Sequence, residues 1–121
     1  MSSTVEKGRI AEDMALKFLQ DKGLWLKERN FRYGHREIDL IMESHKKLHI
    51  IEVKSLDSRF SDNPLEKVDQ RKRRLLVSAA GRYAALHRVV KEIQFDVVSV
   101  LKKGTEFELE YLPNAFYPIY H

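Results

Sequence analysis

The sequence contains no cysteine, and this absence excludes a disulfide framework and thiolate metal sites. It also lacks any apolar run that approaches the ~20 residues needed to cross a bilayer as a helix. The first residues are polar and charged, which argues against a secretory signal peptide. Internal repeats, low-complexity tracts and linkers are absent as well. We therefore expect one cytoplasmic domain over residues 1–121, with no membrane partner.

The composition that remains is that of a folded, basic domain. Apolar residues make up 43% of the chain and aromatic residues 10%, which is enough for a core. The net charge of +4 at pH 7 favours a polyanionic partner such as nucleic acid, although many basic proteins bind none. The five histidines show no spacing typical of metal ligands, and His45 and His49 are expected at the surface.

Hydrophobic periodicity and turn residues predict the element order α-β-β-β-α-β-β. The first helix is expected over residues 4–22 and the second over 64–86, which begins with a typical Asn63-Pro64 start. The apolar stripe of the first helix is predicted at Ile10, Ala11, Met14, Ala15, Phe18 and Leu19. Strands are expected over residues 24–29, 36–43, 47–54, 93–101 and 106–112. This order predicts an α/β fold with a mixed β-sheet flanked by helices.

The hairpin formed by the second and third strands carries charges in its most strand-like segments. If its turn lies at residues 45–46, Asp39 is opposite Glu52, and Glu37 is opposite Lys54. Because side chains alternate along strands, these four share one face of the sheet. The other face then carries Ile38, Leu40, Ile51 and Val53.

This charged face has two interpretations, and the residues leave both open. It is either a salt-bridged, exposed surface or a metal site. Two opposed carboxylates repel each other unless a cation lies between them, and Asp39 with Glu52 suits a hard cation such as Mg²⁺. Lys54 would then orient a water molecule or stabilise developing negative charge. Apolar residues share the face, which weakens the first interpretation: Ile41, Leu48 and Ile50.

The second predicted helix carries a lysine on its apolar side. Helical periodicity puts Lys72 at the centre of an arc of apolar residues. That arc consists of Val68, Leu75, Leu76, Ala79 and Tyr83. A lysine in this position either extends its ammonium group to solvent or meets carboxylates on the sheet.

The same helix begins with a dense run of basic residues. A run of this kind is often only a solvated helix face. If it binds nucleic acid instead, counterions are released and affinity falls steeply with salt. The residues expected to contact nucleic acid are Arg32, Arg59, Arg71, Lys72, Arg73 and Arg74.

Several short motifs resemble those of known families. EIDLI followed by IIEVK resembles the motif of the PD-(D/E)xK nuclease superfamily, although Ile38 stands where that motif has proline. The whole chain is similar to the bacterial UPF0102 family, although Ser55 is followed by Leu56 where that family often has arginine. The matching segments are Gly8–Asp13, Arg29–Gly34, Glu37–Ile41, Glu52–Ser55, Val68–Leu76, Phe95–Val98 and Phe116–Pro118.

The resemblance implies a restriction-endonuclease-like fold, close to archaeal Holliday-junction resolvases, which often work as homodimers. It also implies a site in which Asp39, Glu52 and the Val53 carbonyl hold Mg²⁺ or Mn²⁺ and Lys54 positions the attacking water. Glu12, at the edge of the apolar stripe of the first helix, resembles the extra metal-site glutamate of resolvase-like nucleases. Its alternative is an ion pair with a nearby cation such as Arg9.

The leading hypothesis is therefore a metal-dependent nuclease that acts on DNA, with branched or single-stranded DNA as candidate substrates. The rival is a non-catalytic nucleic-acid-binding module of the same fold. A third possibility is a protein-interaction domain that uses the aromatic tail, Phe116, Tyr117, Ile119 and Tyr120. The set of Asp39, Glu52 and Lys54 favours the enzyme.

Overall fold

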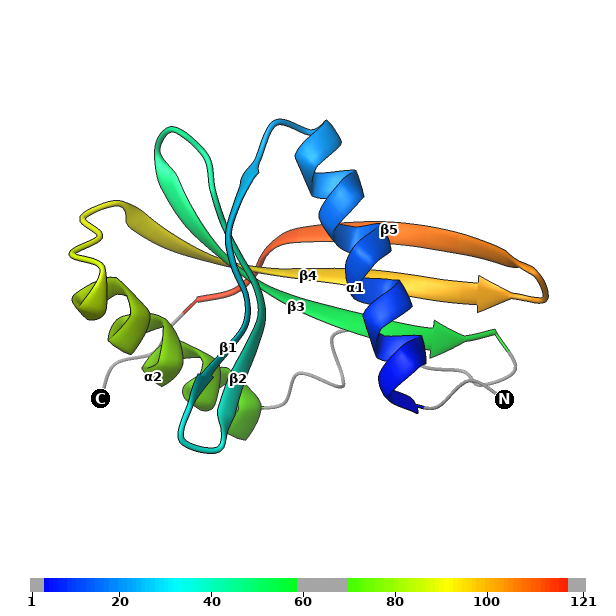
Figure 1. The fold of residues 1–121 in the computed structure, drawn as a ribbon, viewed down its shortest axis with the longest axis horizontal. Helices are drawn as coiled ribbons and strands as arrows, with labels where there is room; N and C mark the ends of the chain where they lie inside the picture. The colour runs from blue at the N-terminus through cyan, green and yellow to red at the C-terminus, as the bar shows by residue number, and fades with distance from the viewer. Residues whose placement is uncertain (1–3, 59–69, 118–121) are drawn as a thin grey trace.

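The computed structural model describes residues 4–58 and 70–117, and its elements follow the predicted order (Figure 1). The helices are α1 (Thr4–Asp21) and α2 (Gln70–Leu86). The strands are β1 (Trp25–Tyr33), β2 (Arg36–Glu43), β3 (Lys47–Asp57), β4 (Glu92–Lys103) and β5 (Glu106–Phe116). The α/β class and the element order are confirmed, whereas the predicted helix start at Asn63-Pro64 lies outside the described residues. No helix in the described segments has the length and apolar character needed to cross a membrane.

One mixed sheet of five strands lies between the two helices, in the order β1-β2-β3-β4-β5. The β3–β4 pair is parallel and is connected through α2, and the other neighbours are antiparallel. Ile41 and Ile50 pack with α2, whereas their neighbours Leu40 and Ile51 pack with α1. The side chains of successive strand residues therefore pack into two separate cores, one under each helix.

The predicted register of the β2–β3 hairpin is confirmed. Leu40 pairs with Ile51, and Glu43 pairs with Leu48 next to the turn. The pairing begins at Leu40, so Asp39 lies just beyond the paired segment. There β2 leaves β3 and runs with β1 toward α2, while β3 continues beside β4 (Figure 1).

The prediction that Ile38 shares a face with Leu40 is wrong. Ile38 is fully buried in the core under α2, and Leu40 is buried in the core under α1. On the neighbouring β1, Asn30 lies between the paired residues Arg29 and Phe31 and has a φ of 53°. A left-handed residue breaks the extended geometry on which alternation depends, and asparagine tolerates it better than most residues.

Ile10 also departs from its predicted place in the apolar stripe of α1, because 48% of it is exposed. The buried residues Ala11, Ala15 and Leu19 are spaced four apart, so the stripe is narrow. Ile10 is about 100° away from Ala11 around the helix and falls outside it.

The first residue of the aromatic tail packs on the sheet. Phe116 ends β5, pairs with Phe95 in the β4–β5 register and stacks on it with 5.0 Å between ring centroids. Tyr117 is 73% exposed. Ile119 and Tyr120 lie outside the described residues.

A buried polar network connects β3, β4 and β5, and the sequence did not reveal it. Asp96 is 1% exposed and accepts hydrogen bonds from Gln94 and Tyr111 at 2.8 Å and from the Asn114 backbone N–H at 3.1 Å. Its carboxylate also lies 2.8 Å from Nδ1 of His49, which is buried rather than at the surface. Burial opposes ionisation of Asp96, but these hydrogen bonds outweigh burial and hold its pKa below the usual value.

Asp96→Ala should lower the free energy of unfolding by about 3 kcal/mol at pH 7, because it leaves several buried donors without an acceptor. The folded pKa is lowered, so the stabilisation is present above the unfolded value of about 3.9 and fades as pH falls below it. Urea unfolding at pH 7 and pH 3 checks both statements. Asp21→Ala is the control because Asp21 forms only an exposed pair with Lys17. Equal stability of Asp96→Ala and wild type at pH 7 would contradict a structural role for the network.

Candidate active site

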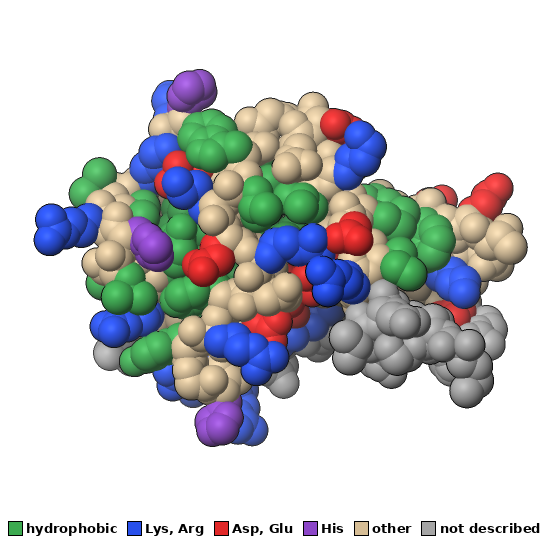
Figure 2. All heavy atoms as spheres, in the orientation of Figure 1, with side chains coloured by type: hydrophobic (Ala, Val, Ile, Leu, Met, Phe, Trp, Pro, Cys, Tyr) green, Lys and Arg blue, Asp and Glu red, His purple; other side chains and the backbone are tan. Residues whose placement is uncertain are grey.

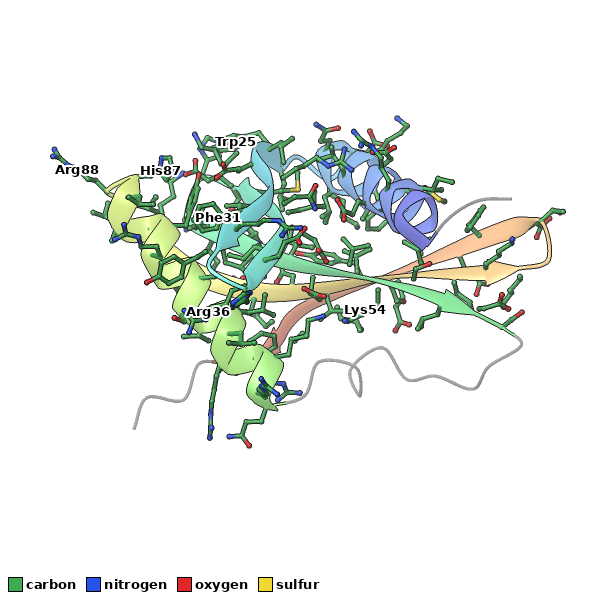
Figure 3. All side chains as sticks on the ribbon, turned by 60° about the horizontal axis from the view of Figure 1, so that its bottom comes forward. Trp25, Phe31, Arg36, Lys54, His87 and Arg88 are labelled. Carbon is green, nitrogen blue, oxygen red and sulfur yellow. The ribbon has the colours of Figure 1, made fainter. Side chains whose placement is uncertain are left out.

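A cleft of about 450 Å³ opens between the β1–β2 hairpin and the N-terminal half of α2. Acidic and basic side chains lie side by side near the middle of this face of the molecule (Figure 2). Figure 3 shows Arg36 reaching toward α2 from the hairpin, and Lys54 on the neighbouring β3. The residues that line the cleft are His35, Arg36, Glu37, Asp39, Glu52, Arg71, Lys72, Leu75 and Leu76.

The structure brings Asp39, Glu52 and Lys54 together at this cleft. Glu52 is 5% exposed, and its Oε1 lies 3.1 Å from Nζ of Lys54. Oδ2 of Asp39 accepts a hydrogen bond of 2.8 Å from the backbone N–H of Val53. Both contacts form where the pairing of β2 and β3 ends. The position of the site is therefore set by the point at which these two strands separate.

Lys72 meets a carboxylate, which is one of the two alternatives that its position on the helix left open. Its Nζ lies 2.5 Å from the same Glu52 oxygen that contacts Lys54. Two ammonium groups therefore share one nearly buried carboxylate, one from β3 and one from α2. This ion pair joins α2 to the sheet at the floor of the cleft.

The electrostatics of the site follow from burial and from this crowding of charges. Burial and then the nearby Glu52 raise the pKa of Asp39 to about 8, so Asp39 is mostly protonated at pH 7 in the metal-free protein. Burial, helped by the ammonium of Lys72, lowers the pKa of Lys54. Burial opposes the charge of Lys72 as well, but its contact with Glu52 outweighs burial and raises the pKa of Lys72.

Glu12 lies near this site but is held by other partners. Its side chain is 16% exposed and contacts Arg29 at 3.4 Å, rather than the Arg9 that the sequence suggested. The amide of Asn30 donates to Glu12 at 3.1 Å and to Glu37 at 3.0 Å. Glu12 is close enough to contribute to the raised pKa of Asp39, after burial and Glu52.

A second groove, also of about 450 Å³, lies on the α1 side and is lined by Gly8, Arg9, Glu12, Asn30, Arg32 and Glu37. Glu37 lines both hollows, so the β1–β2 hairpin separates the groove from the cleft. Arg32, predicted to contact nucleic acid, is 75% exposed on this side and pairs with Glu37 at 3.2 Å.

The other predicted basic residues are spread around the N-terminal half of α2. Arg71 lines the cleft beside Lys72, and Arg74 is exposed. The guanidinium of Arg73 lies 5.3 Å from the centroid of the Phe116 ring, so it takes part in packing. Arg59 lies outside the described residues. His35 and Arg36 line the cleft but escaped the sequence analysis, because only the tertiary fold brings their turn next to α2.

The oxygen atoms at the cleft are ligands that suit a hard cation, although only a few residues supply them. Within residues 4–58 and 70–117, no group of three or more His, Cys, Asp or Glu side chains is arranged to hold a metal ion. Asp39 accepts a hydrogen bond from the Val53 N–H, and Glu52 precedes Val53 in the chain, so the Val53 carbonyl would add a third oxygen to the two carboxylates. An all-oxygen set is what Mg²⁺ and Mn²⁺ prefer. Burial, and then the charge of the nearby Glu52, raises the pKa of Asp39.

Comparisons with known proteins agree with the resemblance seen in the sequence. The model of the uncharacterised protein family UPF0102 matches residues 11–100. A UPF0102 protein of Flavobacterium psychrophilum is 35% identical over 117 residues, which cover 97% of this chain and 98% of that protein. A UPF0102 protein of Bacteroides thetaiotaomicron is 31% identical over 118 residues, with 98% of each chain covered. One from Porphyromonas gingivalis is 34% identical over 96% of this chain and 87% of its own.

Replacing Asp39 by Asn should stabilise the metal-free protein at high pH. A carboxyl whose folded pKa is raised loses stability as pH rises from the unfolded value of about 3.9 through the folded value. For Asp39 that loss runs up to about pH 8. We expect the free energy of unfolding of Asp39→Asn to exceed that of wild type by several kcal/mol at pH 9 and by little at pH 4, measured by urea unfolding in EDTA. Asp21→Asn, at an exposed position, is the control. A constant difference across this pH range would show that Asp39 has an ordinary pKa.

Proposed function

This chain belongs to the uncharacterised protein family UPF0102, and from the geometry of its cleft we propose that it is a metal-dependent nuclease acting on DNA. The observation that supports this most is the meeting of Asp39, Glu52 and Lys54 where β2 and β3 separate. Two carboxylates can hold a metal ion, and a nearby lysine can stabilise negative charge, which are the groups that metal-dependent phosphodiester hydrolysis uses. Basic residues at the rim of the cleft can bind the DNA phosphates.

Each residue has a role in this proposal. Asp39 and Glu52, with the Val53 carbonyl, would hold Mg²⁺ or Mn²⁺, and the bound ion would act as a Lewis acid and lower the pKa of a water molecule. Lys54, at 3.1 Å from Glu52, lies where it can orient the attacking water and stabilise the charge that develops on the phosphate oxygens. Glu12 would assist from α1 through its field at Asp39.

Lys72 explains how the acidic pair is tolerated in the metal-free protein. Its ammonium lies on Glu52 and neutralises charge that a bound cation would otherwise neutralise. Because a lysine side chain is long and flexible, Lys72 can leave Glu52 when a cation arrives and turn toward a DNA phosphate at the rim, beside Arg71.

The same contact favours one alternative, a non-catalytic nucleic-acid-binding module. In that case Lys72 and Lys54 satisfy Glu52 permanently, a hydrogen bond from Val53 satisfies Asp39, and the acidic cluster only stabilises the fold. The two functions differ in what Lys54 does, since it has no catalytic task in a binding module.

Lys54→Ala should lower the rate of DNA cleavage at least about 100-fold while leaving DNA affinity nearly unchanged, because its charge acts mainly in the transition state. The assay is cleavage of duplex, single-stranded and four-way-junction DNA with Mg²⁺ or Mn²⁺. Binding is measured separately in EDTA. Lys102→Ala, on the exposed far end of β4, is the charge-matched control and should cleave like wild type.

Two results would contradict the nuclease. One is equal cleavage by wild type and Lys54→Ala. The other is no cleavage by wild type with any of these metals and substrates while DNA still binds. The second result would favour the binding module.

Metal affinity should rise with pH, because a cation must displace the proton from Asp39. Below its pKa of about 8 the gain should approach about tenfold per pH unit, and it should level off above that value. Calorimetric titration with Mn²⁺ between pH 6 and 9, in buffers of different ionisation enthalpy, measures the affinity and the released proton. Asp39→Asn should bind weakly and show little pH dependence. Glu12→Gln should keep the pH dependence, since the displaced proton is that of Asp39. A pH-independent affinity in wild type would place the metal elsewhere.

A further inference from the structure

At the β1–β2 turn, two guanidinium groups lie over one aromatic ring. The Cζ atoms of Arg36 and Arg82 lie 5.4 Å and 5.7 Å from the centroid of the Tyr33 ring. Tyr33 is 39% exposed, and Arg82 is exposed on α2. Solvent therefore reaches part of an aromatic ring that has two positively charged groups over it.

These two arginines differ from their neighbours in having no acidic partner among residues 4–58 and 70–117. Arg29 and Arg32, on the same strand as Tyr33, each contact a carboxylate. In the part of the chain that the structure describes, no carboxylate pairs with Arg36 or Arg82. Like charges held at one ring repel each other, and an anion bound between them would relieve that repulsion.

The position of the ring relates it to the cleft. Arg36 lines the cleft that contains Asp39 and Glu52, and so does its neighbour His35. Arg82 lies farther along α2, beyond Lys72 and Arg71. A strand of nucleic acid whose phosphate reaches the floor of the cleft would therefore pass Tyr33 as it leaves.

We propose that Tyr33, Arg36 and Arg82 bind an unpaired nucleotide of single-stranded DNA, with its base stacked on Tyr33 in place of a guanidinium group and its phosphate bound by the two arginines. This assignment rests on the proposed nuclease function and specifies its substrate. Stacking on an aromatic side chain requires a base whose face is free, and in a duplex both faces are covered by neighbouring pairs. The site therefore selects single-stranded or unpaired segments, without strong sequence preference.

The test is binding of a fluorescent oligothymidine and of a duplex of equal length, measured by anisotropy in EDTA so that no cleavage occurs. Tyr33→Ala should weaken single-strand binding about tenfold and duplex binding less than about twofold. Tyr33→Phe keeps the ring and should bind like wild type. Arg82→Ala should weaken single-strand binding and lower the slope of log affinity against log salt by about 0.7.

Trp25→Ala is the matched control. Trp25 has the same exposed fraction as Tyr33, 39%, and has Lys91 over its ring at 5.1 Å, but it lies away from the cleft (Figure 3). It should leave single-strand binding unchanged. Circular dichroism of each variant confirms that the fold is retained.

Three results overturn the inference: equal single-strand affinity of Tyr33→Ala and wild type, an equal loss for single strand and duplex, or no single-strand binding by wild type. The nuclease proposal fails by a separate readout, the absence of cleavage with Mg²⁺ or Mn²⁺. If the protein binds single strands through Tyr33 but never cleaves them, the nucleotide-binding site is supported and the nuclease proposal is contradicted.

Discussion

The hydrogen bond from the Val53 N–H to the Asp39 carboxyl is the contact on which the rest of the site depends. β2 and β3 pair only from Leu40–Ile51 to the hairpin turn, and beyond that point β2 turns away. A separated strand leaves backbone donors that must find other acceptors when they are buried. Asp39 supplies the acceptor at 2.8 Å, so the sheet can open without an unsatisfied N–H. The same opening creates the cleft and puts Glu52 at its floor.

Charge is the second constraint, and it explains the unusual chemistry of the cleft. Burial raises the pKa of Asp39 to about 8, while two lysines from different elements crowd onto Glu52. An arrangement selected for stability alone would place apolar or well-paired residues here. Proteins accept such losses at sites that act on ligands. A cation that replaced the proton of Asp39 and released Lys72 would resolve both conflicts at once.

Much of this arrangement could be predicted from the sequence, because it depends on local periodicity. Alternation along the hairpin gave the register that brings Asp39 near Glu52, and helical spacing indicated that Lys72 faces the sheet. Two of the places where prediction failed depend on distant contacts. Ile38 lies in the core under α2, where β2 has left β3 and pairs only with β1. His49 is buried because its partner Asp96 comes from β4.

Dependence on distant contacts also explains why the sequence did not reveal the ring of Tyr33 and its two arginines. Nothing in the local pattern relates Tyr33 or Arg36 to Arg82, which comes from a helix far along the chain. Only the packing of the β1–β2 hairpin against α2 brings them together. Sequence periodicity therefore predicted the acidic floor of the cleft and the basic residues of α2, while the ring of Tyr33 with Arg36 and Arg82 required the structure.

The most direct test of a cation site at Asp39 and Glu52 is a crystal structure of the protein soaked in Mn²⁺, with anomalous scattering recorded at the manganese edge. The account predicts a single strong peak between the two carboxylates, within about 2.2 Å of an oxygen from each, with Lys72 moved away from Glu52. A map with no peak there, and with Lys72 still on Glu52 at saturating Mn²⁺, would contradict it.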